Sequence, residues 1–281
     1  VSMQAVTYKP YYLAPGSGFT LFAAHLDHGL RPSSADEAAW CVGLCETLGI
    51  ACLSERRNIR LPGKENTTGL EEQARSERYA FLRSAAEYFN CTSIAAGHTL
   101  NDLAEDVLMR LIRGSGWPGL GGMAAVDPER RLVRPLLACS RLSIENFLNG
   151  IGMSWLEDES NADQTFFRNR VRHSLLPAVL GENPSFLDRA LGLWQLARID
   201  QQFFDDALAD AGAAAASPGD SGSLTITSDS LAVLSKSLRL RLYMRAVAAL
   251  GPGQSQLKNL LSLDETWLSM RDGNASRGSR R

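Results

Sequence analysis

The residues best suited to chemistry lie between positions 98 and 113, where polar side chains recur at helical spacing. Asn101 is a residue type that caps helices, so we expect a helix to begin there. One side of this helix is apolar, and the other carries an imidazole, two carboxylates and a guanidinium, from His98, Asp102, Glu105 and Arg113. Carboxylates three residues apart can hold a cationic ligand or a metal ion. An ordinary solvated helix face would show the same pattern, so both interpretations stay open.

A second group of charged residues lies in the string GLEEQARSERYAFL, residues 69–82. Arg75 and Arg78 are three positions apart and share a helix face, and Glu71 precedes Arg75 by four. The pattern is typical of a helix stabilised by exposed ion pairs. Two arginines near the ligand-binding end of a strand could equally neutralise phosphate charge.

A third group is AAHLDHGLR, residues 23–31, where His25 and His28 flank Asp27 directly after a strand. A metal site is conceivable, but no cysteine is present and the spacing fits no common ligand pattern. We favour a purely structural role, in which Asp27, Gly29 and Pro32 form a turn.

A basic run with aromatic neighbours occupies the later part of residues 155–177. Arg168 and Arg172 are four positions apart and share a helix face, next to Phe166 and Phe167. Arginines beside exposed aromatic rings suit phosphate contact and base stacking. A basic solvated face with buried phenylalanines is an equally good interpretation.

Short apolar runs alternate with helical patterns in the first half of the chain. Strands are predicted at residues 19–25, 50–54 and 92–96, and helices at 33–49, 70–90 and 101–112. Strands that alternate with helices predict an α/β fold, with a parallel sheet that helices cover on both faces. A helix that follows such a strand begins where open α/β sheets bind ligands.

Helical patterns dominate after about residue 140, at residues 142–150, 169–180, 186–209 and 238–250. Residues 211–223 are small and polar and predict a flexible connection. We therefore expect an α/β domain at 1–140, a linker and helical segment at 141–180, and a smaller helical domain at 181–281. The final string, RDGNASRGSRR, has four arginines without apolar partners; it could touch RNA, but a frayed or artificial tail is favoured.

The bulk composition excludes some classes of function. With 281 residues the chain suits two domains, and its net charge of −2 means that any nucleic-acid surface must be local. No apolar stretch approaches the ~18 residues of a membrane span. The first residues also lack the charged and then apolar pattern of a signal peptide, so a cytoplasmic protein is expected. The cysteines are odd in number and lack C-x-x-C spacing, which predicts reduced, mostly buried thiols at Cys41, Cys45, Cys52, Cys91 and Cys139.

Taken together and in this order, these strings and the glycine-rich RGSGWPGLGGM (residues 113–123) resemble the tRNA(Ile)-lysidine synthetases. The resemblance runs from about residue 20 to 180 and more loosely to 250. It implies that residues 1–140 are a catalytic ATP-pyrophosphatase domain of PP-loop type, that the helical segment at 141–180 contacts tRNA, and that a further helical domain follows. In that family the wobble cytidine of tRNA(Ile) with a CAU anticodon attacks the α-phosphate of ATP. The ε-amino group of L-lysine then displaces AMP at C2 to give lysidine.

The resemblance also implies roles for individual residues. The lysine amine would be held, and the reaction assisted, by Asp102, Glu105, His98 and Arg78. ATP would be contacted by Ser2, Ala24, His25, Gly97 and Arg75. Contacts with the tRNA would come from Arg113, Arg168, Asn169 and Arg172. Mg²⁺ is expected with the ATP, and a homodimer is possible; no metal-ligand set is expected in the protein itself.

The sequence departs from the family pattern at two places. The PP-loop string S-G-G-x-D-S does not occur, and only Ser2 could be its last residue, so we expect preceding residues to supply it. Leu103 and Asp106 stand where the family usually has glutamine and threonine, which affects fine positioning. The alternatives are a catalytically inert tRNA-binding homologue and another PP-loop enzyme such as a tRNA thiolase, which typically needs paired cysteines. A generic helical interaction module leaves the histidine and acidic stripe unexplained.

Overall fold

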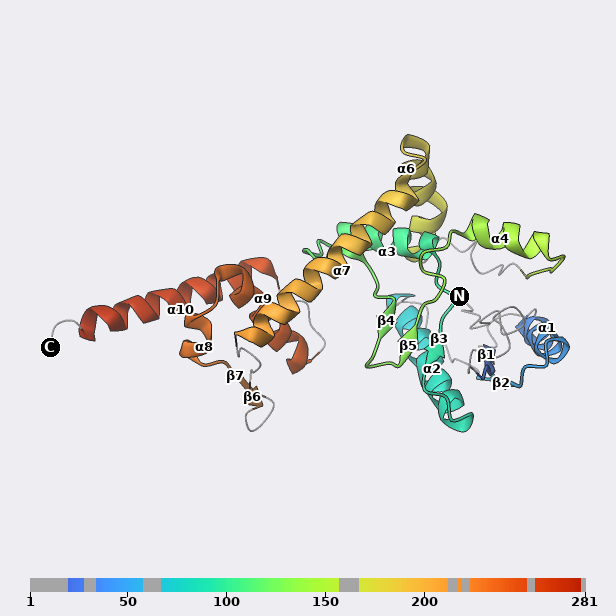
Figure 1. Ribbon diagram of the computed structural model, residues 1–281, viewed down its shortest axis with the longest axis horizontal. Coiled ribbons are helices and arrows are strands. Elements are labelled where there is room, and N and C mark those ends of the chain that lie inside the picture. Colours follow the sequence, from blue (N-terminus) through green and yellow to red (C-terminus); the bar gives the residue numbers. More distant parts are fainter. Residues whose placement is uncertain are drawn as a thin grey trace. The chain divides into compact units, whose positions relative to one another are not determined.

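The computed structural model describes residues 20–27, 34–57, 67–156, 167–211, 217–218, 223–251 and 256–278. Backbone contacts divide the chain into two compact units, with the boundary between Ala197 and Arg198. The first unit has an α/β architecture and the second is mostly helical (Figure 1), which confirms the predicted fold class. The boundary falls inside one long helix, so residues 141–180 lie in the first unit. The functional segmentation at residues 140 and 180 stays a prediction.

The first sheet consists of two parallel strands, β1 (Ala23–Asp27) and β2 (Cys52–Arg56). Parallel neighbours need a crossover, and helix α1 (Ser34–Thr47) supplies it. The strands pair from Ala23 opposite Cys52 to Asp27 opposite Arg56. Both strands were expected from the sequence, although each begins later than the apolar run suggested.

A different helix covers each side of this sheet, because successive side chains of a strand point to opposite faces. Ala23 packs in an apolar cluster with Cys45 of α1. Leu26 packs instead with Phe81 of helix α2 (Thr67–Tyr88). The two-sided coverage explains why β1 is largely buried along its length, including its polar residues His25 and Asp27.

A second sheet has the strand order β3–β5–β4, from β3 (Ile94–Ala95), β5 (Leu132–Val133) and β4 (Val126–Asp127). Strands β3 and β5 are parallel, and β4 runs antiparallel to β5. Sequence patterns missed β4 and β5, since two residues are too few for periodicity to show. The cluster around Phe81 includes Ile94 and Leu132, so one core joins both sheets.

The helix predicted to carry the chemistry is α3 (Leu100–Ile112), which directly follows β3. Its apolar side packs through Ala104, Leu108 and Met109 against the helices that come later in the first unit. The elements that follow α3 are the 3-10 helix η1 (Gly119–Gly121), α4 (Arg141–Gly150), α5 (Phe167–Arg170), the π-helical turn η3 (Val171–Leu175), α6 (Leu176–Glu182) and α7 (Phe186–Asp210). The last four of them contribute to this apolar cluster. The predicted helix at 169–180 thus contains a π-helical turn, a feature that often occurs at functional sites.

The second unit begins within α7 and is built around one apolar cluster, which includes the fully packed Leu208 and Tyr243. Its elements after α7 are β6 (Ser217–Pro218), β7 (Leu224–Thr225), α8 (Ser228–Ala232), α9 (Lys236–Leu250) and α10 (Leu257–Gly278). Helix α10 was not predicted, and it corrects the expectation of a frayed tail, because the backbone is helical as far as Gly278. None of the described helices is both long and apolar enough to cross a bilayer.

Candidate active site

The start of α3 is shaped by a reciprocal cap in which Thr99, and not the predicted Asn101, is the capping residue. The Thr99 N–H donates to Asp102 Oδ2 at 2.9 Å, and the Thr99 hydroxyl lies 2.8 Å from the same oxygen. The Asp102 N–H points back to the hydroxyl. Asn101 instead accepts the Arg141 N–H, which joins the starts of α3 and α4. The cap fixes the position of the Asp102 carboxylate in the first turn of α3, the helix that follows β3.

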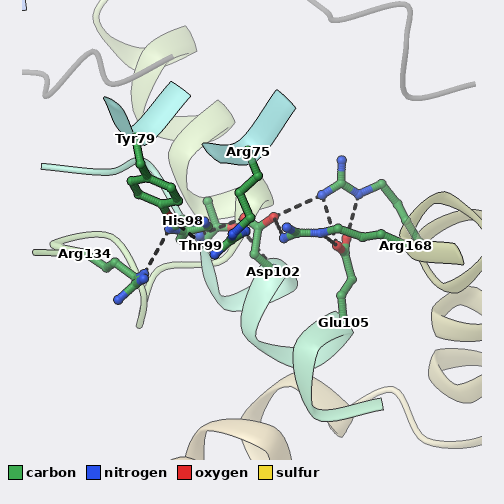
Figure 2. Close-up of polar contacts among 9 residues, drawn as sticks. Arg75, Tyr79, His98, Thr99, Asp102, Glu105, Arg134 and Arg168 are labelled. Atoms are coloured by element: carbon green, nitrogen blue, oxygen red, sulfur yellow. Dashed lines mark hydrogen bonds and ion pairs between the residues drawn. The ribbon is translucent and has the colours of Figure 1, made fainter. Parts of the chain in front are cut away.

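Two arginines from α5 and η3 bind the two carboxylates of α3. Arg168 donates to Asp102 Oδ1 at 2.8 Å and to Glu105 Oε2 at 3.1 Å. Arg172 donates to both Glu105 oxygens at 2.6 and 3.0 Å, and to Asp102 Oδ1 at 3.0 Å. Figure 2 shows the Arg168 and Asp102 side chains directed at each other across the gap between their helices. We call these four residues the Arg–carboxylate network.

The network is largely removed from water, and its charges balance. Glu105 is 1% exposed, and the side chains of Arg168 and Arg172 are 16% and 15% exposed. Burial would raise the pKa of Asp102, but Arg168, the Thr99 hydrogen bonds and Arg172 together lower it below its ordinary value. Burial would likewise lower the pKa of Arg168, but Asp102 and Glu105 raise it. Asp102 and Arg168 are therefore both charged at neutral pH, as a buried ion pair must be.

His98 lies just before α3 and is bound by an arginine that the sequence analysis did not select. Arg134, which follows β5, donates from Nε to His98 Nδ1 at 3.1 Å. His98 is 3% exposed and Arg134 is 7% exposed. Burial is the main reason why the pKa of His98 falls to about 3; Asp102 opposes the fall, and Arg134 adds to it. His98 is therefore neutral at physiological pH.

A second group of arginines surrounds Tyr79 of α2, beside His98 (Figure 2). Arg75 donates to the Tyr79 hydroxyl at 3.4 Å, and its Cζ lies 5.2 Å from the centre of the ring. Arg130, from the turn between β4 and β5, has its Cζ 5.8 Å from the same ring. Arg78 is half-buried on the same helix. The arrangement gathers positive charge next to the imidazole, which suits an anionic ligand.

The other predicted nucleotide residues that the structure describes lie in β1 and after β3. Ala24 is half-buried and His25 is buried, and burial lowers the pKa of His25 despite the nearby Asp27 carboxylate. Asp27 is the last residue of the strand and lies 3.5 Å from the Arg56 guanidinium; Gly29 and Pro32 of the predicted turn lie outside the described residues. Gly97, after β3, is exposed. Ser2 and His28 lie outside the described residues.

The residues predicted to contact tRNA fall into two environments. Arg113, at the end of α3, is exposed, with its Cζ 5.4 Å from the centre of the Phe167 ring. The exposed Arg170 approaches the same ring at 5.7 Å. Asn169 is 1% exposed, and Arg168 belongs to the Arg–carboxylate network, as does Arg172. Only Arg113 therefore offers its guanidinium to a large ligand without rearrangement, and the tRNA contacts of the other three stay a prediction.

The cysteines show no catalytic arrangement in the described part of the chain. All five are free thiols, and Cys139 is the exposed one. Burial raises the pKa of Cys41 to about 11 and that of Cys52 to about 12, so neither is a thiolate at neutral pH. Among the described residues no three His, Cys, Asp or Glu side chains group closely enough to hold a metal ion.

Sequence patterns found the two carboxylates and His98, but missed three residues of the site. Thr99 is a residue type that often caps helices, but Asn101, two positions later, is an equally good candidate in the sequence. Arg130 and Arg134 flank a two-residue strand, which has no periodic pattern. The signal that was available for Arg134 is its place in LVRPLL, an arginine within an apolar run, because such a charge needs a buried partner.

Comparisons with known proteins agree on one family. A family model described as a PP-loop domain matches residues 3–179. A protein named tRNA(Ile)-lysidine synthase from Nitratidesulfovibrio vulgaris is 42% identical over 94% of this chain and 80% of its own length. Another of that name, from a Bradyrhizobium species, is 35% identical over 93% of this chain and 76% of its own length.

Other relatives of the same name are longer. The chain covers only 43% of the one from an Azoarcus species, to which it is 40% identical. Among solved structures, the U34-tRNA thiolase NcsA from Methanococcus maripaludis has a TM-score of 0.52 and 18% identity, over 64% of this chain and 62% of that one. At that identity the likeness concerns the fold alone.

Proposed function

Because the chain belongs to the tRNA(Ile)-lysidine synthase family of PP-loop proteins, we propose that it couples L-lysine to the wobble cytidine of tRNA(Ile) with a CAU anticodon. Family membership supports the use of ATP and a tRNA substrate. The proposed reaction first transfers AMP to the cytidine C2 oxygen and releases pyrophosphate. The lysine ε-amino group then attacks C2, and AMP leaves.

The observation that carries the proposal is the pair of carboxylates, half-buried Asp102 and buried Glu105, beside His98 after β3. Open α/β sheets bind ligands at this end of their strands. The carboxylates already accept seven hydrogen bonds, five from guanidinium groups and two from Thr99. A lysine ammonium offers the same cationic N–H donors, so the pair has the chemistry to bind one.

The same count implies that lysine cannot simply be added to the pair. Asp102 accepts four hydrogen bonds, which uses the lone-pair sites of a carboxylate, and Glu105 accepts three. Glu105 keeps one lone-pair site, so lysine can bind both carboxylates only if it replaces Arg168 or Arg172 at an oxygen of Asp102. The phosphates of a bound tRNA are the natural alternative partner for a displaced guanidinium. Lysine and tRNA binding are then coupled through these arginines, which also accounts for their predicted place near the tRNA.

The amine must lose its proton before it attacks, because only the free base is nucleophilic. If Asp102 and Glu105 bound the lysine ammonium too tightly, they would stabilise its protonated form and prevent loss of the proton. Competition from two guanidiniums weakens that hold, and this favours release of a neutral amine toward C2. Asp102 and Glu105 thus bind and orient the lysine in this proposal, with His98 and Arg78 lining the same pocket.

The nucleotide and tRNA sites rest on a looser set of observations. In this proposal ATP contacts exposed Gly97 after β3 and half-buried Ala24 and buried His25 of β1, with Arg75 near the phosphates. Mg²⁺ would accompany the triphosphate and screen its charge. Arg113 and Arg170 around Phe167 form an exposed basic surface suited to the tRNA backbone. A homodimer remains part of the proposal.

The test is ATP-dependent incorporation of labelled lysine into tRNA(Ile) with a CAU anticodon, by the protein that contains these 281 residues. Pyrophosphate release is measured in parallel, because it reports the first step alone. Asp102→Asn should prevent incorporation at low lysine and leave pyrophosphate release largely intact. Asp106→Asn is the matched control on the same helix, since Asp106 forms an ion pair with Arg110 at i+4 and lies outside the Arg–carboxylate network.

The alternatives give different results in the same assay. Tight binding of this tRNA with neither pyrophosphate release nor incorporation would favour an inert tRNA-binding homologue. Pyrophosphate release that does not respond to lysine, followed by transfer of sulfur to the tRNA, would favour a thiolase. Wild-type incorporation by Asp102→Asn at low lysine would remove the acid pair from lysine binding.

A further inference from the structure

Arg134 is held in one orientation by the backbone around it. Its N–H donates to the Ala125 carbonyl at 2.8 Å, and its carbonyl accepts the Leu137 N–H at 3.2 Å. One terminal nitrogen of its guanidinium, Nη1, donates to the Ala124 carbonyl at 2.5 Å. With the guanidinium held in this way, its Nε–H is directed at His98 Nδ1, 3.1 Å away (Figure 2). An anchored arginine has little freedom to turn away from the imidazole.

The chemistry of this contact determines where the proton of His98 lies. A guanidinium only donates hydrogen bonds, so the imidazole nitrogen that faces it must present a lone pair. The single proton of the neutral ring is then on Nε2. An imidazolium would place an N–H against an N–H and a positive charge against a buried positive charge. The arrangement therefore selects both the neutral state and one of its two tautomers.

We infer that Arg134 is a positioning residue that holds His98 as the neutral Nε2–H tautomer, so that His98 donates a hydrogen bond to a ligand oxygen and does not accept the proton of the attacking amine. The inference rests on the proposed function for the identity of the ligand, but not for the state of the ring. The only basic nitrogen of the neutral imidazole is Nδ1, and Arg134 occupies it.

The other charged groups that face His98 come from three elements. Asp102 of α3 favours the imidazolium, whereas Arg168 of α5, Arg75 of α2 and Arg134 oppose it. Burial of the ring opposes it as well, and is the largest effect. One carboxylate therefore faces three guanidiniums, and Asp102 is itself engaged by Arg168. A neutral Nε2–H donor suits an oxygen on which charge develops, such as a phosphate or cytidine oxygen.

The deciding experiment is ¹⁵N nuclear magnetic resonance of the full chain labelled at histidine. The chain has only four histidines, so the His98→Gln variant identifies the His98 signals. We expect a protonated Nε2 and an unprotonated Nδ1 that do not change between about pH 5 and pH 8, where an ordinary histidine titrates. The spectrum of the wild-type protein is sufficient for this test. A protonated Nδ1, a mixture of tautomers, or titration in that range would overturn the inference.

Two substitutions of Arg134 test its part in this state. Arg134→Met removes the donor, and should give a mixture of tautomers or a change in titration of His98. Arg134→Lys keeps a donor and a charge, and should keep Nδ1 unprotonated. A His98 spectrum in Arg134→Met that matches the wild type would overturn the positioning role. If neither variant folds, the wild-type spectrum still decides the tautomer.

The donor role has its own readout in pyrophosphate release and lysine incorporation. Glutamine can donate from its amide where Nε2–H donated, but it cannot take up a proton at neutral pH. His98→Gln should therefore retain at least tenfold more activity than His98→Ala, and Arg134→Lys more than Arg134→Met. Equal losses in His98→Gln and His98→Ala would overturn the donor role. A protein with no lysine incorporation at all would refute the proposed function and leave the spectroscopic result standing.

Discussion

Replacement of Asp102 by asparagine keeps the shape of the side chain and removes its charge. In the folded protein this carboxylate accepts hydrogen bonds from Thr99, Arg168 and Arg172. The asparagine carbonyl can still accept from Thr99. Its amide group then faces two guanidiniums, none of which can accept a hydrogen bond. The substitution therefore loses two charge-assisted contacts and leaves Glu105 as the only carboxylate of the Arg–carboxylate network.

The magnitude follows from the burial of these groups. Removal of one partner from a buried ion pair costs about 3–5 kcal/mol when the other charge is left alone. Both arginines keep Glu105, at 2.6 to 3.1 Å, so the loss should be smaller. We expect Asp102→Asn to lower the free energy of unfolding of the first unit by about 2–4 kcal/mol. Asp106→Asn, in a partly exposed i,i+4 pair, should cost only about 0.5 kcal/mol.

The effect should depend on pH in a defined direction. The pKa of Asp102 is lowered in the folded state, so its ionisation contributes stability that is present above the ordinary value of 3.8. That contribution is lost as the pH falls through the folded pKa. The difference in unfolding free energy between the wild type and Asp102→Asn should therefore be full at pH 7 and shrink below about pH 4.

Native-state hydrogen exchange of the α3 amides is the appropriate assay, because the chain has two compact units and exchange reports the opening of each helix on its own. Asp102→Asn should speed exchange along α3 and leave the amides of α9 unchanged. The reasoning is refuted if Asp102→Asn destabilises α3 no more than Asp106→Asn does, or if the difference from wild type persists at low pH. Because Asp102→Asn lowers the free energy of unfolding, its activity should be measured well below its melting temperature, where the variant is still folded.

Three further outcomes are expected. Asp264→Asn should destabilise the second unit by about 3–5 kcal/mol, because it breaks a two-point ion pair with Arg239 at 2.6 and 2.9 Å; exchange of the α9 amides measures it. Gly122→Ala should lower the free energy of unfolding of the first unit by about 1–3 kcal/mol in urea, since φ is +92° and the added Cβ meets Leu103 at 2.8 Å. Arg113→Ala should weaken tRNA binding and reduce the salt slope by about one, in filter binding across salt; an unchanged slope would remove Arg113 from the interface.

Local patterns were sufficient wherever an element was long and strongly periodic. The apolar run before β1 and the helical spacing in α3 predicted both elements, and the i,i+3 spacing placed Asp102 and Glu105 on one face. The choice of Thr99 over Asn101 as the cap needed the backbone, because both residue types cap well. Thr99 has the extended conformation that a capping residue requires, with φ −112° and ψ 176°.

The amino-acid sequence by itself determined which groups are available: two carboxylates, an imidazole and a set of arginines on strands and helices of an α/β unit. Only the tertiary structure decided which of them meet. Arg168 is 66 positions from Asp102, and Arg134 is 36 positions from His98. Such partners are selected by the packing of α5 and η3 on α3 and by a two-residue strand, and neither leaves a periodic trace in the sequence. The charge state of His98 follows from those contacts, because burial and the facing guanidiniums exist only in the folded chain.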